Sequence, residues 1–466
     1  MSNSREKELT KNTLIITVGR ISTQFVSFLL LPLYTALLST EEYGTVDLIT
    51  TLVQLIVPVS SLMIDQSVFR YLLSSETDKD RKIIITSAVG IITSASIATI
   101  ILYFVINPFV KSNYKIWLLF ILIATSFSGL FLQVARGLKQ IADYALGSFI
   151  CSVSTIVLNV VCIVSLKMGA TGMLVAIFAG NLICCLFLFI KLRIIKYISI
   201  PLFSIENAKF QLRYSIPLVP NQLSLWIMNS SDRLLVSLFL GTATNGVLAV
   251  SHKFSAIYLT FFNIFLLAWH EMGAVHYFDE DRDEFFSHML EKMISIFSTL
   301  CLGIMVVLPI VFGWLVNSAF HEAYYNVPIY LVASLFNIVV GLLGVVYVAT
   351  KKTTEIAKTT IISAIINILV NIALINVIGL YAASISTFAS YLVTMIYRVY
   401  DTRKYLNIKY SIKQYLLIAV ALVICTVIYY LKNTVVSLVF LPVFILVALW
   451  VNKNVLNEII IFAKKK

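Results

Sequence analysis

The stretch YSIPLVPNQLSLWIMNSSDRLLVSLFLGTATNGVLAVSHKF, Tyr214 to Phe254, decides how this chain must fold. It contains two apolar spans near the middle of the sequence, and Asp232, Arg233 and Lys253 stand within them. A charge at membrane depth costs a few kcal/mol on insertion scales and roughly 10 kcal/mol or more in some simulations, so such residues usually face a partner or a water-filled cavity. We therefore expect this segment to line a path through a membrane.

The composition of the whole chain places it in a membrane. Of its 466 residues, 59% are hydrophobic and only 12% are charged, whereas charged residues make up about a quarter of a soluble domain. The six cysteines fall within apolar runs and lack the spacing of a zinc or redox pair, which favours a role in packing. The long unbroken runs exclude the alternating pattern of a membrane β-barrel, so we predict an all-α polytopic membrane protein.

Apolar windows of about 20 residues predict about 14 transmembrane helices. The residues before the first window are polar and basic but lack a small-residue cleavage site, so we expect the first helix to be retained. The predicted helices lie near 13–38, 44–66, 83–106, 116–135, 146–166, 171–190, 216–240, 246–268, 292–316, 325–349, 358–378, 380–400, 414–431 and 434–451.

The distribution of positive charge predicts the orientation. Most of the 35 Lys and Arg residues fall on one side of the membrane if the N-terminus is cytoplasmic. The positive-inside rule therefore predicts that both termini are cytoplasmic. The net charge of +12 is spread over many cytoplasmic segments, which favours contact with anionic membrane lipid over binding of nucleic acid.

A weak internal repeat divides the chain. The run LLSTEEYGTVDLIT (Leu37 to Thr50) resembles FLGTATNGVLAVSH (Phe239 to His252), and Thr40 and Gly44 match Thr242 and Gly246 at one constant offset. Two similar bundles related by an axis along the membrane normal are a recurrent transporter arrangement, although a static channel or scaffold would also fit a duplication. We predict two pseudo-symmetric six-helix lobes plus two C-terminal helices. The expected boundaries are an N-terminal lobe (1–190), a cytoplasmic linker (191–213), a C-terminal lobe (214–400) and the last two helices with a basic cytoplasmic tail (401–466).

Polar residues recur at helical spacing in four of the predicted helices, so each set shares one helix face. The sets are Thr13, Thr17, Arg20, Gln24, Ser27 and Tyr34 in the first helix; Asp47, Thr51, Gln54, Pro58, Ser61 and Asp65 in the second; Gln222, Trp226, Asn229 and Arg233 in the seventh; and Lys253, Ala256, Thr260, Asn263 and His270 in the eighth. Isolated polar residues commonly serve helix packing. Four long stripes favour a hydrated cavity between the lobes.

The cations of these stripes occupy two predicted depths. With a rise of about 1.5 Å per residue, Arg20 lies about 10 Å from the cytoplasmic end of its helix, and Arg233 and Lys253 lie about 10 Å from the outer ends of theirs. This arrangement suits a substrate that carries phosphate, which Arg binds through paired hydrogen bonds and Lys as a point charge. The alternative is a pair of structural ion pairs, Arg20 with Asp65 and Asp232 with Lys253. Both interpretations stay open at this point.

Several motifs resemble a known family. Pro217-Leu218-Val219-Pro220, Asp232-Arg233, Phe239-Leu240-Gly241, Gly246 and Lys253 resemble the mid-chain signature of the polysaccharide-transport branch of the multidrug/oligosaccharidyl-lipid/polysaccharide (MOP) exporter superfamily, the O-antigen (Wzx-type) flippases. Leu38-Ser39-Thr40-Glu41-Glu42-Tyr43-Gly44 is similar to the opening motif of that family, and Arg136-Gly137-Leu138 with Tyr144-Ala145 is similar to its fourth loop. The resemblance covers essentially the whole chain. Val247 departs from it, since the family commonly has Tyr after this Gly.

The resemblance implies a flippase of the bacterial inner membrane, not an enzyme. It would move an undecaprenyl-pyrophosphate-linked O-antigen or capsule repeat unit by alternating access, as one step of lipopolysaccharide or other polysaccharide biosynthesis. Its implied partners are this lipid-linked oligosaccharide, membrane lipid and polysaccharide polymerase or chain-length proteins, with no nucleic acid and no cofactor or metal beyond a coupling H+ or Na+. The implied site residues are Arg20, Arg233 and Lys253 for pyrophosphate, Gln24, Gln54, Gln222, Trp226 and Asn229 for sugar, and Asp47, Asp65 and Asp232 for ion coupling.

Two other functions can be weighed against this one. A multidrug or other small-molecule antiporter of the same superfamily would share the fold and the repeat, but its substrates are usually cationic, which Arg20 and Arg233 disfavour. A membrane polymerase or ligase would need a large outer loop with catalytic Arg or His, and the outer loops of this chain are short. The lipid-linked oligosaccharide flippase is therefore the preferred hypothesis.

Overall fold

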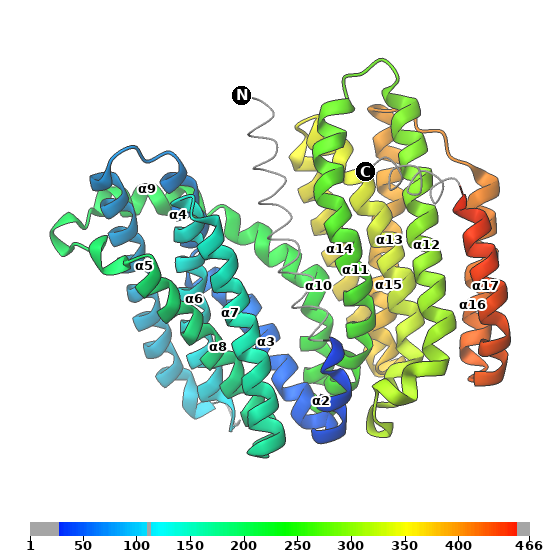
Figure 1. Ribbon diagram of the computed structural model, residues 1–466, viewed down its shortest axis with the longest axis horizontal. Helices are drawn as coiled ribbons and strands as arrows, with labels where there is room; N and C mark the ends of the chain where they lie inside the picture. The colour runs from blue at the N-terminus through cyan, green and yellow to red at the C-terminus, as the bar shows by residue number, and fades with distance from the viewer. Residues whose placement is uncertain (1–27, 110–112, 454–466) are drawn as a thin grey trace. The chain divides into compact units, whose positions relative to one another are not determined.

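The computed structural model describes residues 28–109 and 113–453, and within these ranges the chain is helical with no β-strand. Short 3-10 or π turns join or extend several of the helices. The α-helices labelled in Figure 1 are α2 (Leu31–Leu37), α3 (Thr40–Ser60), α4 (Ile64–Leu73), α5 (Asp78–Ile106), α6 (Lys115–Gly137), α7 (Ile141–Val160), α8 (Gly169–Lys191), α9 (Ile205–Ser215), α10 (Leu218–Leu240), α11 (Thr242–His276), α12 (Arg282–Leu315), α13 (Ala323–Ala349), α14 (Thr353–Ile378), α15 (Tyr381–Asp401), α16 (Ile412–Tyr430) and α17 (Thr434–Val451).

These helices confirm the predicted class. In the described part of the chain, 11 helices are long and apolar enough to cross a membrane, by length and composition. Each predicted helix from 83–106 onward coincides with a helix, while most of the predicted helix 13–38 lies outside the described residues. Helices α10 and α15 are not among the 11, because their polar residues lower the mean hydropathy. The chain is an all-α polytopic membrane protein.

One predicted helix is wrong in detail. The single helix predicted at 44–66 is two helices, α3 and α4, separated at Ser61–Met63. Leu62 and Met63 both have left-handed backbones, with φ of 51° and 50°. Because residues other than Gly seldom adopt this conformation, two in succession end the helix and redirect the chain. The predicted polar face therefore does not continue from α3 to Asp65.

The described residues form two compact units. The N-terminal unit contains Leu37–Ser230, and the C-terminal unit contains Leu31–Ala36 together with the chain from Ser231 onward. The division falls within α10, between Ser230 and Ser231, so the two ends of this helix belong to different units. The boundaries predicted from the sequence stay a prediction, including the linker at 191–213.

Within the N-terminal unit, closely packed helices form the core. Inside a membrane, van der Waals contact between helices replaces the hydrophobic effect as the main source of association, and small residues permit that contact. Gly180 of α8 is such a residue, because a Cβ there would lie 2.0 Å from the Thr155 hydroxyl and 3.0 Å from the Cys151 carbonyl of α7. Ile64, Val68 and other buried residues of α4, α5, α6 and α8 complete the core.

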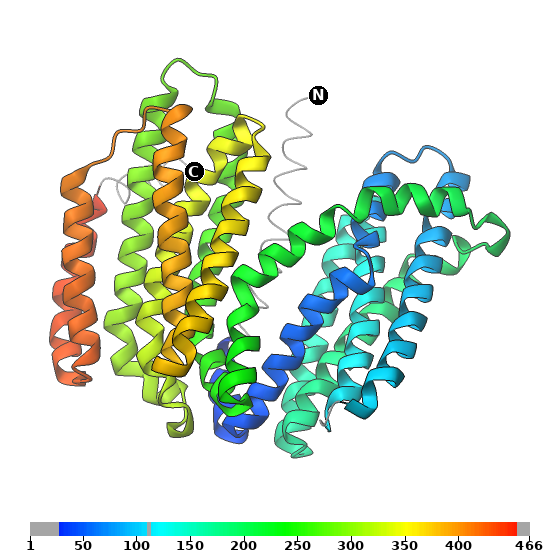
Figure 2. The same cartoon turned by 180° about the vertical axis from the view of Figure 1, so that it is seen from behind.

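Helix α9 crosses the ends of α4 and α5, as Figure 2 shows. The Gln211 amide of α9 donates to the Ile84 carbonyl of α5 at 3.0 Å, and the ring of Tyr71 on α4 lies 4.6 Å from that of Phe210. In the segment before α9, the carbonyl of Tyr197 accepts a hydrogen bond from the Thr86 hydroxyl of α5 at 2.9 Å. The end of the predicted linker is thus bound to the N-terminal unit by specific polar and aromatic contacts.

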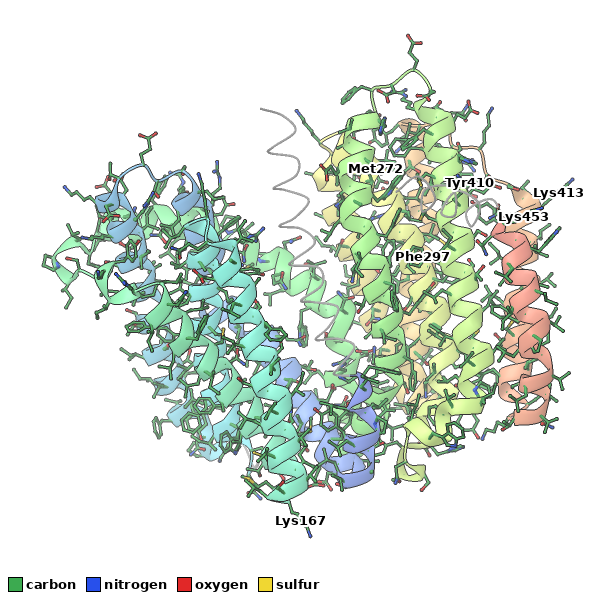
Figure 3. All side chains as sticks on the ribbon, viewed as in Figure 1. Lys167, Met272, Phe297, Tyr410, Lys413 and Lys453 are labelled. Carbon is green, nitrogen blue, oxygen red and sulfur yellow. The ribbon has the colours of Figure 1, made fainter. Side chains whose placement is uncertain are left out.

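In the C-terminal unit, α13 is the most buried candidate span and packs against both α11 and α15. Polar side chains join these helices, since the Trp269 indole donates to the Leu342 carbonyl at 3.0 Å. The Arg398 guanidinium of α15 is buried and donates to the Val340 carbonyl of α13 at 2.7 Å. Phe297 of α12, labelled in Figure 3, packs edge-on against Phe262 at 5.3 Å. These contacts give the unit a fixed frame for the side chains that α10 contributes.

The last two helices form a hairpin on α12. Lys413 at the start of α16 and Lys453 after α17 lie at one end of it (Figure 3). The other end is fixed to α13, where the Tyr324 hydroxyl donates to the Tyr429 carbonyl and the Tyr429 hydroxyl to the Tyr324 carbonyl, each at 2.7 Å. Between α12, α16 and α17 lies an almost wholly apolar pocket of about 250 Å³.

Candidate functional site

A polar pocket of about 410 Å³ lies within the N-terminal unit. Helices α3 and α10 supply most of its wall, and Thr125 of α6 completes it. The structure brings together four of the five predicted sugar-contact residues here, while Gln24 lies outside the described residues. The residues that line the pocket are Val53, Gln54, Val57, Pro58, Thr125, Gln222, Leu225, Trp226, Asn229 and Ser230.

Pro58 and Trp226 shape the wall of this pocket. Pro58 lies inside α3 and has no backbone N–H, so the helix lacks the hydrogen bond that the Gln54 carbonyl would otherwise accept. The Trp226 indole N–H donates to the Thr51 carbonyl at 3.0 Å, which joins α10 to α3. The Trp226 side chain is therefore buried and oriented, and its N–H is already used. Gln54 and Asn229 are the exposed polar members of the wall.

A sugar is the kind of molecule that this lining can bind. Carboxamide side chains both donate and accept hydrogen bonds, which matches the hydroxyl groups of a carbohydrate. An indole adds a flat apolar surface of large area. The pocket wall contains no Asp, Glu, Lys or Arg among the described residues, so it offers hydrogen bonding without charge.

The predicted acids of the N-terminal unit lie apart in sequence and on different helices. Asp47 is half-buried in α3, near the start of the helix. Asp65 is half-buried in α4, beyond the break at Ser61–Met63, and accepts a hydrogen bond from the Gln66 amide at 2.6 Å. Neither residue lines the polar pocket.

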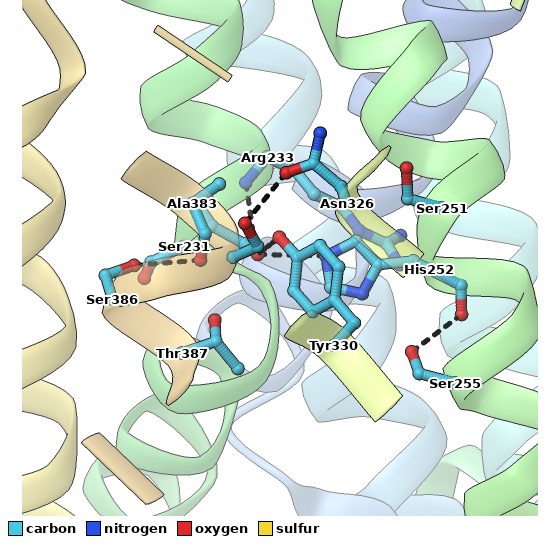
Figure 4. Close-up of polar contacts among 12 residues, drawn as sticks. Ser231, Arg233, Ser251, His252, Ser255, Asn326, Tyr330, Ala383, Ser386 and Thr387 are labelled. Atoms are coloured by element: carbon cyan, nitrogen blue, oxygen red, sulfur yellow. Dashed lines mark hydrogen bonds and ion pairs between the residues drawn. The ribbon is translucent and has the colours of Figure 1, made fainter. Parts of the chain in front are cut away.

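The C-terminal unit contains a buried charged cluster, shown in Figure 4, that we call the Asp232 cluster. It consists of Asp232 on α10, His252 on α11 and Tyr330 on α13. One carboxylate oxygen of Asp232 lies 2.9 Å from His252 Nε2 and accepts the Tyr330 hydroxyl at 3.0 Å. The other accepts the backbone N–H of Arg233 at 2.9 Å. A buried carboxylate is stable only when hydrogen bonds or counter-charges replace its water, and here three hydrogen bonds do so.

A network of neutral polar groups extends from the cluster to α14 and α15. The Ser231 hydroxyl donates to the Asn367 side-chain oxygen at 3.2 Å, and the Asn367 amide donates to the Thr387 hydroxyl at 3.2 Å. One turn further along α14, Asn371 is fully buried, and neither polar atom of its side chain has a hydrogen-bond partner among the described residues. The first residues of α10 in the C-terminal unit are thus bonded to three other helices, α11, α13 and α14, and α14 is bonded in turn to α15.

The predicted cations are placed only in part. Arg233 on α10 and Lys253 on α11 are half-buried and both belong to the C-terminal unit. Arg20 lies outside the described residues. The alternative from the sequence was an Asp232–Lys253 ion pair, and the hydrogen-bond partners of the Asp232 side chain are instead His252, Tyr330 and the Arg233 N–H.

Sequence reasoning missed His252 and Tyr330. A signal for His252 existed, because α10 and α11 form a hairpin at Gly241, and Asp232 and His252 lie at similar distances on either side of that turn. Tyr330 gave no such signal, since it comes from α13 and meets Asp232 only through tertiary packing. Within the described residues, no group of three or more His, Cys, Asp or Glu side chains could hold a metal ion.

Comparison with known proteins gives one family and one fold. A family model described as "Polysaccharide biosynthesis protein" matches residues 9–269. No curated protein matches the chain in sequence. The chain is similar in structure to lipid II flippase MurJ in an inward closed conformation, with a TM-score of 0.70 and 13% identity over 96% of this chain and 100% of that one.

The fold is also similar to that of multidrug transporters. An inward-facing multidrug resistance MATE family transporter of the MOP superfamily gives a TM-score of 0.66 and 12% identity over 83% of this chain and 98% of that one. A mutant of the Vibrio cholerae MATE transporter VcmN gives a TM-score of 0.57 and 12% identity over 86% and 97% of the two chains. At such low identity these structures establish the fold alone.

Proposed function

The chain belongs to the polysaccharide biosynthesis protein family of the MOP superfamily, and from that premise we propose that it is a lipid-linked oligosaccharide flippase. Its substrate would be an undecaprenyl-pyrophosphate-linked repeat unit of O-antigen or capsule, moved across the bacterial inner membrane by alternating access. Both termini would be cytoplasmic, and a polysaccharide polymerase and chain-length proteins would act on the exported unit. The protein would work as a transporter and not as an enzyme.

The observation that carries this proposal is the polar pocket of the N-terminal unit. It places three carboxamides and an indole around a volume of about 410 Å³, without a charged side chain in its wall among the described residues. A site for a cationic drug would be expected to offer acidic or purely aromatic surroundings, whereas carboxamides match the hydroxyls of a sugar. Gln54, Gln222, Trp226 and Asn229 are the proposed sugar contacts here, with Gln24 as a further one.

The charged residues are assigned to pyrophosphate binding and to ion coupling. Arg233 and Lys253, with Arg20, are the proposed contacts for the pyrophosphate, because Arg and Lys both bind phosphate oxygens through charge-assisted hydrogen bonds. Asp47, Asp65 and Asp232 are the proposed sites of ion coupling, with H+ or Na+ as the coupling ion. The buried, fully hydrogen-bonded environment of Asp232 supports this role most strongly among the three.

A flipping assay tests the function. The purified protein is reconstituted into vesicles with a fluorescent undecaprenyl-pyrophosphate oligosaccharide, and loss of fluorescence to a membrane-impermeant quencher reports movement between leaflets. We expect flipping by the wild type and a loss of about 10-fold or more in the double variant Gln54→Ala, Gln222→Ala, since each lost hydrogen bond to a bound sugar is worth about 1 kcal/mol.

The matched control is Gln133→Ala, which removes a half-buried glutamine of α6 that does not line the pocket. Its flipping rate should equal that of the wild type. Equal rates in the double variant and the control would contradict the pocket's role. Export of a cationic dye without any flipping would instead establish a multidrug antiporter.

A further inference from the structure

The hydrogen bonds of the Asp232 cluster fix where its hydrogens are. An ionised carboxylate can only accept hydrogen bonds, so the 2.9 Å contact with His252 Nε2 requires the hydrogen on that nitrogen. The Tyr330 hydroxyl and the Arg233 N–H point their hydrogens at the same carboxylate. Of the imidazole atoms, Nδ1 is then the position at which a second proton binds. In the described part of the chain, Nδ1 has no hydrogen-bond partner.

Asp232 and His252, which we call the pair, differ in burial. The Asp232 side chain is 3% exposed and that of His252 is 13% exposed. The imidazole is therefore the more accessible member of the pair. When a proton binds to it, the pair changes from a net charge of −1 to a neutral ion pair, and the Nε2–H···O contact is retained. A charge change of this kind in a buried site alters the stability of the surrounding packing, because an uncompensated buried charge is costly.

In the described part of the chain, the other charged and titratable groups close to the pair lie on α10, α11 and α15. Arg233 follows Asp232 on α10, Lys253 follows His252 on α11, and Tyr391 lies on α15. Helix α14 faces the cluster with Asn367, a neutral amide that bonds Ser231. Histidine is the side chain whose charge ordinarily changes between about pH 5 and 8.

A proton fits this cluster better than a metal ion does. Na+ and similar ions bind through the lone pairs of oxygen atoms. Here three of the about four lone pairs of the Asp232 carboxylate accept hydrogen bonds, from His252, Tyr330 and the Arg233 N–H. A cation at this carboxylate would meet the hydrogens of these three donors, which repel it, whereas a proton at Nδ1 leaves each of the bonds in place.

We propose that the Asp232 cluster is a proton-binding site of the C-terminal unit, in which His252 gains and loses the proton and Asp232 and Tyr330 position it. This inference rests on the proposed ion-coupled export and names its ion as the proton. Protonation of His252 acts on α10. Asp232 is the second residue of α10 within the C-terminal unit, so the charge of the pair controls how firmly that end of the helix is bonded to α11 and α13.

The test uses the intact protein in lipid nanodiscs with all histidines 15N-labelled. The chain has five histidines, and the imidazole signal that disappears in His252→Gln belongs to His252. We expect its two ring nitrogens to show the Nε2–H tautomer at high pH and a doubly protonated ring at low pH. In Asp232→Asn, which removes the charge but keeps the size, the profile of this signal against pH should differ from that of the wild type.

A natural control lies elsewhere in the same helix. His276 Nδ1 lies 2.6 Å from the Asp279 carboxylate, and both side chains are exposed. His276→Gln therefore removes an exposed histidine–aspartate pair, in contrast to the buried pair of His252 and Asp232. The His252 signal should be unchanged in this variant. Tyr330→Phe, which removes only the hydroxyl, should retain the titration and displace its midpoint. This second variant keeps the test decisive if Asp232→Asn fails to fold.

Two results would overturn the inference. One is a His252 ring whose protonation state stays constant from pH 5 to pH 8.5. The other is a titration that is the same in the wild type, Asp232→Asn and Tyr330→Phe. The measurement needs no substrate, so it fails or succeeds independently of the flipping assay, and the two proposals can be rejected separately.

Discussion

Two hairpins of the molecule share one architecture and differ in chemistry. Helix α3 begins at Thr40 and helix α11 begins at Thr242, the two positions that the internal repeat aligns. Gly44 and Gly246 are both buried one turn later. The same offset that aligns these residues places Thr50 opposite His252 and Leu30 opposite Asp232.

The two aligned residues Thr50 and His252 differ in their hydrogen bonds. In the N-terminal unit the Thr50 hydroxyl bonds only within its own helix, to the Asp47 carbonyl at 2.9 Å. At the aligned position in the C-terminal unit, the His252 imidazole bonds to a buried carboxylate on another helix. The starts of α3 and α11 are therefore alike, whereas of the two aligned residues it is His252 that contacts a buried carboxylate. A duplicated scaffold can carry a different chemical task in each copy.

The largest expected effect is on the buried charge. Asp232→Ala leaves the buried His252 and Tyr330 donors without their acceptor, and we expect it to lower the free energy of unfolding by about 1–3 kcal/mol for each donor. Thr50→Val at the aligned position should lower it by about 1 kcal/mol or less, because only one local hydrogen bond is lost. Thermal unfolding of the detergent-solubilised variants measures both. Equal losses would show that the second hairpin has no special dependence on its charge.

A smaller effect concerns the helix starts. Ser39 caps α3 through a reciprocal pair of hydrogen bonds with Glu42, whereas Gly241 begins α11 with φ of 90° and ψ of 165°. Only Gly adopts that second conformation readily, so Gly241→Ala should cost about 1–3 kcal/mol although space for the methyl group is available.

Ser39→Ala should cost about 1 kcal/mol, the usual value for a lost N-cap. Unfolding midpoints in the same detergent give the ranking of the two variants. A larger loss for Ser39→Ala than for Gly241→Ala would show that the Gly241 backbone conformation is not required.

Much of the fold is predictable because the apolar runs match the helices that span the hydrocarbon. Prediction failed at the ends, where helices continue into polar sequence. Helix α11 runs on to His276 and α12 begins at Arg282, well outside the predicted 246–268 and 292–316. A hydropathy window detects burial in lipid and not helix formation in water, so it cannot see these extensions. It also misses the break at Ser61–Met63, since Leu62 and Met63 are themselves apolar.

The candidate site was predictable to the extent that one helix face determines it. Helical spacing selected Gln222, Trp226 and Asn229 together, and they line one pocket. The role proposed for them from the sequence stays a prediction. Only part of the Asp232 cluster could be predicted. An Asp within an apolar run stands out in the sequence because placing its charge in a membrane costs free energy, whereas a His or Tyr there does not stand out. Its partners come from α11 and α13, and only the packing of three helices identifies them.

The most direct test of the account is flipping of the fluorescent undecaprenyl-pyrophosphate oligosaccharide in vesicles, with and without an imposed pH gradient. We expect the gradient to accelerate flipping by the wild type and by His276→Gln, and we expect His252→Gln to lose this acceleration. Acceleration of His252→Gln equal to that of the wild type would contradict the proposed proton site. Absence of flipping by the wild type under both conditions would contradict the proposed function itself.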